Sequence, residues 1–397
     1  MRIGIVSPGW PARAVGNGVA SYVEALRPAL QRLGHEVVVL APHDWVEPGA
    51  PGPVHVVAAS RAFRIARWVR RRLGRARPGM VDAAAVLAAA AVTAVRNHRL
   101  DVLEVEEAFG VCGEVGAAVR IPVVVKLHGP AFLLEHESQA GAERELRIAR
   151  EGVGLARAAA VVAPSQATLD ATLARYRLHP AVTRRVPNPL ALPEGPLWSA
   201  ATADPDRVLY VGRFEHVKGG DLALAAFARI AAQRPNARLW FVGHDRGMVG
   251  PGGRRVSLAD HLRTALPPEV AARVDVLGVV PREELVQLRQ RAGVALVASR
   301  FETQSYAALE AMAHGCPEVA FAVGGVAEIV RDGRTGLAVP AEDVGALAAA
   351  ALRVLADPAL AARLGTGARE FVRTTHDPDA IAATMVEVYE AALARAR

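Results

Sequence analysis

Short runs of apolar residues alternate with longer amphipathic stretches along the whole chain. In the first half, apolar runs of strand length occur at residues 3–7, 36–41, 54–58, 102–105, 123–127 and 160–163. Helix-like runs lie between them, and such alternation is typical of parallel sheets covered by helices. The hydrophobic pattern therefore predicts an α/β fold.

A second α/β series follows a break in this pattern. Residues 187–206 are rich in Pro, Ala and Gly and have no periodicity, so we interpret them as an interdomain linker. Apolar runs resume at 208–212, 238–243, 274–277, 294–298 and 318–322, and the last stretch is helical. With 397 residues the chain can form two domains. We place them at 1–190 and 204–377, followed by a terminal helix at 378–397.

Composition narrows the class of protein. Apolar residues make up 52% of the chain, enough for two hydrophobic cores. The longest apolar stretch, 83–95, is shorter than a bilayer-spanning helix. The first strand begins directly after Met1, so we expect no signal peptide and a cytoplasmic location. The cysteines Cys112 and Cys316 each lie in an apolar stretch and predict neither a disulfide framework nor a zinc site.

Two glutamates near the C-terminal end of the second series have a spacing of chemical interest. Glu302 follows the apolar run 294–298, which has the composition of a buried parallel strand, and Glu310 lies within an expected helix at 305–314. The carboxyl ends of parallel strands are where ligands bind in open α/β sheets. Carboxylates accept hydrogen bonds from hydroxyls, so this staggered pair predicts a site for a sugar or a ribose.

The complete string around these glutamates resembles the signature of retaining glycosyltransferases of family 4. It combines Glu-x7-Glu with the small-residue helix Leu-Glu-Ala-Met-Ala at 309–313 and a following Gly-x-Pro at 315–317. The resemblance implies the GT-B fold: two Rossmann-like domains, a donor cleft between them, and a C-terminal helix that crosses back to the first domain. It also implies transfer of a hexose-type sugar from a UDP- or GDP-linked donor to a small-molecule or lipid-linked acceptor, with no further cofactor required.

Two cations follow the first strand of the second series. Arg213 and Lys218 lie five residues apart, and Lys218 precedes an expected helix that begins near Gly220. Cations beside a helix N-terminus favour a diphosphate, because the free N–H groups and the side chains both attract negative charge. The string also resembles the diphosphate-binding element of the family. The alternative interpretation is a solvated basic loop.

The resemblance assigns roles to further residues. Glu302 and the backbone N–H groups of Gln304 and Ser305 would hold the sugar, and Glu310 would hold the ribose. His128, at the end of a first-domain strand, would contact the sugar or stabilise developing charge, unless it is a capping or core histidine. The other expected donor-binding residues are Gly16, Gly18, Gly212, Gly243, Val279, Thr303 and Leu309, and the Gly324–Gly325 pair would shape the cleft behind Glu302.

Three residues depart from the family pattern. Gln304 and Ser305 replace a pair that is commonly Phe-Gly, which leaves the preferred sugar open. Glu318 stands where an apolar strand residue is common.

A second interpretation of the Gly-rich loop is a dinucleotide-binding fingerprint. Gly16 to Ser21 nearly reads Gly-x-Gly-x-x-Ala, and Asp44 follows the second strand. This alternative predicts an NAD-dependent oxidoreductase. However, about nine residues separate the first strand from Gly16, which is too many for the tight turn that the fingerprint requires. We therefore interpret the loop as a backbone approach to the donor phosphate and acceptor.

Two Asp-x-Asp strings also need an explanation, because this motif holds a metal ion in the other glycosyltransferase fold. Asp204–Asp206 lies in the expected linker and Asp377–Asp379 precedes the terminal helix. We interpret both as turn and cap residues and expect no metal requirement.

All the excess positive charge lies in the first half of the chain. Residues 1–195 contain 24 Lys and Arg against 17 Asp and Glu, whereas the remainder has 23 of each.

Eight arginines occur between 61 and 77, on an expected helix with Arg64, Trp68, Arg71 and Arg75 on one face. This helix favours an anionic acceptor or peripheral contact with a membrane surface. A solvated helix face, or a non-catalytic protein that binds a sugar nucleotide or a membrane, is the alternative. We expect no nucleic-acid partner.

Overall fold

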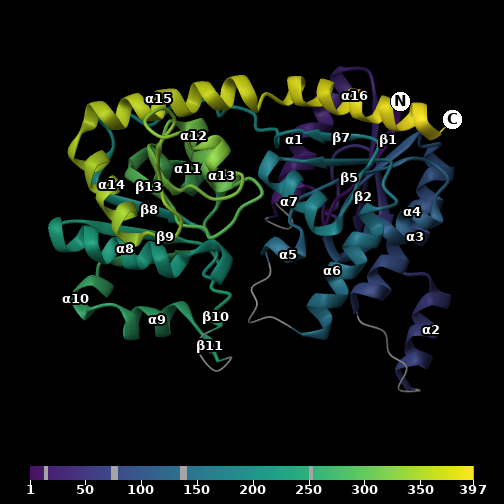
Figure 1. The fold of residues 1–397 in the computed structure, drawn as a ribbon, viewed down its shortest axis with the longest axis horizontal. Helices are drawn as coiled ribbons and strands as arrows, with labels where there is room; N and C mark the ends of the chain where they lie inside the picture. The colour runs from purple at the N-terminus through teal and green to yellow at the C-terminus, as the bar shows by residue number, and fades with distance from the viewer. Residues whose placement is uncertain (13–16, 73–78, 135–140, 250–253, 397) are drawn as a thin grey trace. The chain divides into compact units, whose positions relative to one another are not determined.

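The computed structural model describes residues 1–12, 17–72, 79–134, 141–249 and 254–396 (Figure 1). The chain divides into two compact units. Unit 1 comprises 1–189 together with 377–397, and unit 2 comprises 190–376.

Unit 1 contains a seven-stranded parallel sheet in the order β3-β2-β1-β4-β5-β6-β7. Its strands are β1 Arg2–Val6, β2 Glu36–Pro42, β3 Val54–Val57, β4 Val102–Glu106, β5 Val123–Lys126, β6 Ala160–Ala163 and β7 Thr183–Arg185. Its helices are α1 Gly18–Arg32, α2 Arg61–Arg72, α3 Gly79–His98, α4 Val111–Ala118, α5 Ala131–Leu134, α6 Ala142–Leu155, α7 Gln166–Tyr176 and α16 Pro378–Ala396. The six predicted strands are present, and the edge strand β7 is an addition.

Unit 2 contains a six-stranded parallel sheet in the order β12-β9-β8-β13-β14-β15, and a two-stranded antiparallel ribbon. The strands of the sheet are β8 Asp204–Val211, β9 Arg238–Val242, β12 Val274–Gly278, β13 Ala292–Val297, β14 Glu318–Phe321 and β15 Leu337–Val339; the ribbon is β10 Met248–Val249 and β11 Arg255–Val256. The helices are α8 Gly220–Gln233, α9 Leu258–Ala265, α10 Pro268–Ala271, α11 Arg282–Arg291, α12 Tyr306–His314, α13 Val326–Ile329, α14 Val344–Ala356 and α15 Pro358–Thr375.

Both sheets share one topology. In each unit the first strand lies between the second and the fourth, which is the strand order of a Rossmann fold. In unit 1 the sheet extends from β1 to one side through β2 and β3, and β4 then pairs with the other side of β1. In unit 2 the same reversal occurs between β8 and β13. In such sheets ligands bind beyond the carboxyl ends of the strands at these reversal points.

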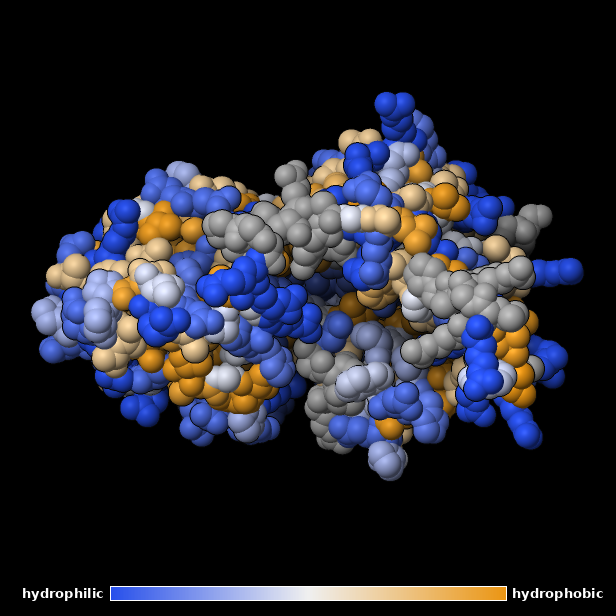
Figure 2. Space-filling model, turned by 90° about the horizontal axis from the view of Figure 1, so that it is seen from below, coloured by the Kyte–Doolittle hydropathy of each residue, from blue (hydrophilic) through white to orange (hydrophobic). Residues whose placement is uncertain are grey.

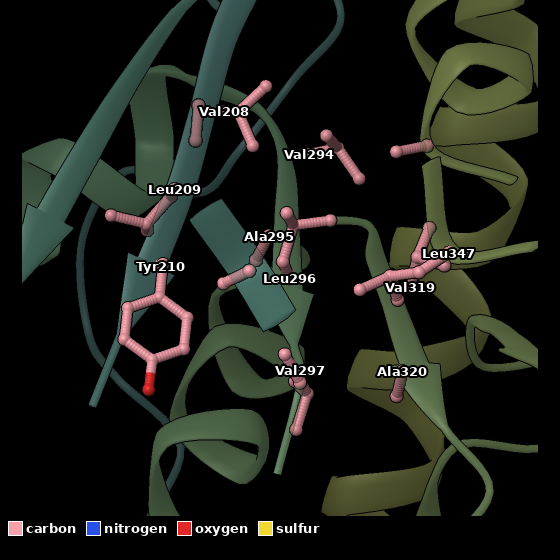
Figure 3. Close-up of a cluster of buried hydrophobic side chains, with 14 of the residues drawn as sticks. Val208, Leu209, Tyr210, Val294, Ala295, Leu296, Val297, Val319, Ala320 and Leu347 are labelled. Carbon is pink, nitrogen blue, oxygen red and sulfur yellow. The ribbon is translucent and has the colours of Figure 1, made fainter. Parts of the chain in front are cut away.

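The core of unit 2 shows why these residues form central strands. Figure 3 shows side chains of β8, β13 and β14 packed together with Leu347 of α14. All six residues of β13 are buried, so the strand is a continuous apolar run without alternation. The helix that follows it begins at its N-cap Ser305, whose hydroxyl accepts a hydrogen bond from the N–H of Ala308, and ends at Gly315 in the left-handed conformation.

Two sequence-based interpretations need correction. Asp204 to Asp206 does not lie in a linker: it begins β8, and the two carboxylates pair with Arg207 and Arg234. The segment before it is also no free linker, because Trp198 is buried and its indole N–H donates to the carbonyl of Ala292 at 2.7 Å.

The expectation that no apolar segment is long enough to span a bilayer was also wrong. Helix α3 has the length and composition of a membrane span. The segments Val344–Ala356 and Pro358–Arg395 together have the same properties, although the chain bends by 105° between them. In this structure α3 packs against α4 and buries Ala84, Ala88, Ala91 and Ala94. One face of α3 therefore packs in the core of unit 1, although only 33% of its apolar window is buried.

The C-terminal helix α16 is fixed to unit 1 by a buried polar contact. It lies beside α1 (Figure 1), and the Tyr389 hydroxyl donates to a Glu104 carboxylate oxygen at 2.5 Å. Burial raises the pKa of Glu104, and it lowers the pKa of the neighbouring Lys126 to about 7. Polar groups removed from water in this way need partners, so this contact contributes to the docking of α16.

We expect Tyr389→Phe to destabilise the protein by about 1–3 kcal/mol, because it leaves a buried carboxyl oxygen without its donor. The matched control on the same helix is Asp379→Asn, which removes the exposed ion pair with Arg32 and should cost less than about 1 kcal/mol. Urea unfolding of both variants measures the difference. Equal unfolding midpoints would contradict the role of the buried contact.

Candidate active site

In unit 2, two residues far apart in the sequence meet at the reversal point of the sheet. Lys218 follows β8 and Glu302 follows β13, and these strands are neighbours. The Lys218 Nζ lies 2.7 Å from Glu302 Oε1, and the Ser299 hydroxyl donates to the same oxygen at 2.9 Å. Glu302 is buried. The structure therefore brings together the predicted phosphate-binding cation and the predicted sugar-binding carboxylate.

The backbone around Lys218 is tightly constrained. Residues His216–Lys218 form a 3-10 turn, and the Tyr210 hydroxyl donates to the Lys218 carbonyl at 2.9 Å. Gly219 then adopts a left-handed conformation with φ 64°, and α8 begins at Gly220. Because Gly219 is the N-cap and has no side chain, no capping oxygen covers the first N–H groups of α8 from this position.

Arg213 stands at the other end of the same loop. Its guanidinium donates to Glu215 Oε1, with Nε at 2.9 Å, and the Glu215 carboxylate is more buried than the arginine. Both predicted phosphate-binding cations are thus held by carboxylates. An anionic ligand at this loop would share these cations with Glu215 and Glu302.

Glycines end three neighbouring strands of unit 2. Gly212 follows β8, Gly243 follows β9 and Gly278 ends β12, and the N–H of Gly243 donates to the carbonyl of Gly278 at 2.7 Å. A Cβ on Gly243 would lie 2.2 Å from the carbonyl oxygen of Gly212, so only glycine allows this approach. Val279, the predicted nucleobase neighbour, is exposed beside these strand ends.

The residues between the two signature glutamates have different surroundings. Thr303, Gln304 and Ser305 are buried, and Leu309 packs in the hydrophobic core of the unit. Glu310 remains partly exposed and forms an ion pair with Arg289.

The predicted Gly-Gly element contacts the backbone of Glu302. The N–H of Gly325 donates to the Glu302 carbonyl at 2.8 Å, and a Cβ on Gly324 would approach the same oxygen to 2.4 Å.

In unit 1, His128 follows β5 and is held through its backbone. Its N–H donates to both carboxylate oxygens of buried Glu107, at 3.1 and 3.0 Å, and the N–H of Gly129 donates to the same group. The His128 ring meets Tyr22 edge to face, with centroids 5.0 Å apart. Burial, with the nearby charge of Lys126, lowers the pKa of His128 to about 3, so the imidazole is neutral at pH 7.

The Gly-rich loop is only partly described. Gly16 lies outside the described residues, whereas Gly18 begins α1, capped by the side chain of Asn17. Strand β1 ends at Val6, so the path to α1 is too long for the tight turn of a dinucleotide fingerprint. Asp44 is exposed beside His43.

The predicted basic helix is α2. Arg64 and Trp68 are exposed on it. Arg71 belongs to the helix, but its side chain lies outside the described residues, as does the whole of Arg75. Among the described residues, no group of three or more His, Cys, Asp or Glu side chains could hold a metal ion.

The sequence interpretation missed several supporting residues. Ser299 and Glu107 contact the predicted site residues directly, and Arg289 pairs with Glu310. Arg300 donates to the His216 carbonyl and to Asp221, at 2.8 Å in each case, and so ties the segment after β13 to the Lys218 turn. Ser299 and Arg300 stand at the carboxyl end of a predicted strand, and that position could have identified them.

Solved structures show the fold to which this architecture belongs. Over its full length the chain resembles sucrose-phosphate synthase from Thermosynechococcus elongatus, with a TM-score of 0.73, 24% identity and coverage of 100% of both chains. It also resembles the Anabaena protein HepE solved with UDP-glucose, with a TM-score of 0.68, 18% identity and coverage of 98% of this chain and 99% of HepE. The fold is GT-B, with two Rossmann-like units, as the sequence predicted.

Two family models match the chain, and together they extend over both units. Residues 16–192 match "Glycosyltransferase Family 4", and residues 205–357 match "Glycosyl transferases group 1". The protein therefore belongs to glycosyltransferase family 4, in agreement with the resemblance found in the sequence.

Curated relatives match over shorter regions. A glycogen synthase of Mycobacterium tuberculosis is 35% identical over 188 residues, which is 47% of this chain and 43% of that enzyme. A D-inositol 3-phosphate glycosyltransferase of Acidothermus cellulolyticus is 36% identical over 195 residues, 48% of this chain and 42% of that enzyme. Each match spans less than half of the relative's length.

We expect Gly219→Ala to displace the Lys218 turn. A Cβ at this position would lie 1.8 Å from the carbonyl oxygen of Ala298, a clash that backbone movement must relieve. The matched control is Gly333→Ala, at φ 67° in the same unit, where the new Cβ meets nothing within 4 Å.

Both substitutions carry the left-handed strain of about 1 kcal/mol. Only Gly219→Ala should lower the melting temperature by clearly more than this strain explains. Equal losses in the two variants would show that the turn is not constrained as described.

Proposed function

We propose that the protein is a retaining glycosyltransferase that moves a hexose-type sugar from a UDP- or GDP-linked donor to a small-molecule or lipid-linked acceptor. The observation that carries this proposal is the meeting of Lys218 and Glu302 at the reversal point of the unit 2 sheet. A cation for phosphate and a carboxylate for hydroxyls in contact suit the junction between a diphosphate and a sugar.

The phosphate end of the donor would lie against the loop after β8. Arg213, Lys218 and the first N–H groups of α8 offer positive charge from side chains and from the helix dipole. Negative charge grows on the diphosphate as the bond to the sugar breaks. Stabilisation of that charge by groups already in place lowers the barrier.

The sugar and the ribose of the donor would bind to the two signature carboxylates. We assign Glu302, with the backbone N–H groups of Gln304 and Ser305, to the sugar hydroxyls, and Glu310 to the ribose. Gly212, Gly243 and Val279 would lie near the nucleotide. Because His128 is neutral at pH 7, we assign it a hydrogen bond to the sugar instead of charge stabilisation.

The proposed chemistry needs no covalent intermediate on the protein. The acceptor hydroxyl attacks the face of the sugar that the diphosphate leaves. Its proton passes to an oxygen of the departing phosphate, and the anomeric configuration is retained. Retention distinguishes this route from direct displacement from the opposite face, which would invert the configuration.

We expect UDP or GDP to raise the melting temperature of the protein, and NAD to leave it unchanged. Lys218→Ala should weaken binding of the stabilising nucleotide by about 10-fold or more, because a hydrogen bond between charged groups contributes about 1.5–3 kcal/mol. The control is Arg263→Ala, which removes an exposed arginine of the same unit. Thermal shift and isothermal titration measure both effects.

Stabilisation by NAD alone would overturn the proposal and favour the oxidoreductase interpretation. Once a donor sugar is found, NMR of the product reports its anomeric configuration. An inverted product would refute retention but not glycosyl transfer.

We further propose that α2 contacts an anionic membrane surface. Its described arginines are accompanied by no acidic residue within the helix, and Arg67 and Arg70 attach it to α3 through Asp82. Ile65, Trp68 and Val69 are exposed large apolar residues.

Figure 2 shows hydrophobic and hydrophilic side chains side by side on the surface of unit 1. Cationic and apolar groups exposed together fit lipid headgroups and the acyl boundary. A lipid-linked acceptor and a peripheral cytoplasmic location would agree with this contact.

We expect the protein to sediment with vesicles that contain phosphatidylglycerol but not with pure phosphatidylcholine, and to be released by salt. Trp68→Ala should reduce sedimentation several-fold, because burial of the ring contributes to binding. The control, Trp45→Ala, removes a ring of similar exposure, 52% against 55%, outside α2. Equal binding of both variants would contradict a role for α2.

A further inference from the structure

A fully buried arginine lies directly behind one of the signature glutamates. Arg289 of α11 is only 2% exposed, and its guanidinium donates to Glu310 Oε2. Glu310 itself is 32% exposed at its side chain. The Nε of Arg289 has no hydrogen-bond partner among the described residues. The pair therefore joins a buried cation to a carboxylate that is still open to a ligand.

The other titratable groups near Arg289 differ from Glu310, because burial disfavours their charged forms. Burial raises the pKa of Glu318 well above its ordinary value, although Arg289 acts in the opposite direction. Burial and the charge of Arg289 lower the pKa of His314 to about 4, and burial raises that of the Cys316 thiol. His314 and Cys316 are therefore uncharged near pH 7, burial disfavours the ionised form of Glu318, and Glu310 is the carboxylate that pairs with Arg289.

The geometry around Glu318 agrees with this division of charge. Glu318 begins β14 and is 1% exposed, and neither of its carboxyl oxygens has a hydrogen-bond partner among the described residues. An ionised carboxylate would be very unfavourable there. The surroundings of this glutamate, which departs from the family pattern, therefore disfavour its ionised form.

A buried guanidinium constrains its partner strongly, because an unpaired charge in the interior is costly. The Glu310 carboxylate is consequently held by Oε2, which leaves Oε1 for a ligand. We propose that Arg289 is a positioning residue that fixes the Glu310 carboxylate for the ribose hydroxyls of the donor. This inference rests on the proposed function, since the ribose belongs to the nucleotide donor.

The test compares a ligand that has a ribose with one that has none. Isothermal titration would measure the nucleoside diphosphate that stabilises the wild type more, UDP or GDP, alongside inorganic pyrophosphate. In Arg289→Met we expect the dissociation constant of the nucleotide to rise about 10-fold, and that of pyrophosphate to change less than 2-fold. Glu318→Gln, which matches the neutral acid in shape, is the control and should bind both ligands as the wild type does.

A double-mutant cycle tests whether Arg289 acts through Glu310. If it does, Arg289→Met combined with Glu310→Gln binds the nucleotide no more weakly than Glu310→Gln alone. Arg289→Lys retains a buried cation and should restore part of the affinity. Should Arg289→Met fail to fold, Arg289→Lys alone and combined with Glu310→Gln supplies the same comparison.

Three results would overturn the inference while the wild type binds the nucleotide. They are unchanged nucleotide affinity in the Arg289 variants, equal loss of nucleotide and pyrophosphate, and additive effects in the cycle. A wild type that binds neither UDP nor GDP would instead refute the proposed function, and the positioning role with it.

Discussion

The parallel pairing of β8 with β13 is the constraint on which the candidate active site depends. Two other strands of the sheet, β9 and β12, and the ribbon β10-β11 separate them in sequence, yet they lie side by side in the sheet. Because both run in the same direction, the residues after each strand emerge at the same edge. Lys218 and Glu302, 84 positions apart, therefore come within 2.7 Å of each other. A different strand order would leave the same residues without a common site.

Buried charge in this protein follows a consistent rule. Ionisable side chains in the interior are either paired or held neutral, because transfer of an isolated charge from water is unfavourable. Glu107 accepts backbone N–H groups, Glu104 accepts the Tyr389 hydroxyl, and Arg289 is paired with Glu310. His128 is uncharged near pH 7, and burial raises the pKa of Glu318 well above its ordinary value. Within unit 1, Glu107 holds the predicted site residue His128 in place, and within unit 2, Arg289 holds Glu310.

Fold and site differ in how far local sequence could predict them. The central strands were predicted because fully buried parallel strands are continuous apolar runs, as in β13. Short edge strands such as β7 and β15 were missed, because they have few residues and little apolar periodicity. Helix α3 was misjudged because a count of consecutive apolar residues stops at isolated polar positions, whereas the helix continues through them.

The sequence by itself determined the alternation of strands and helices, the GT-B fold and the family, because periodicity and motif composition are local properties of the chain. It also identified Arg213, Lys218, Glu302 and Glu310 as candidates. The tertiary structure decided which of these side chains meet and which supporting groups surround them. The contacts of Ser299, Arg300, Glu107 and Arg289 became visible only there, since hydrogen bonds, ion pairs and the cost of burying charge depend on distances between side chains in space.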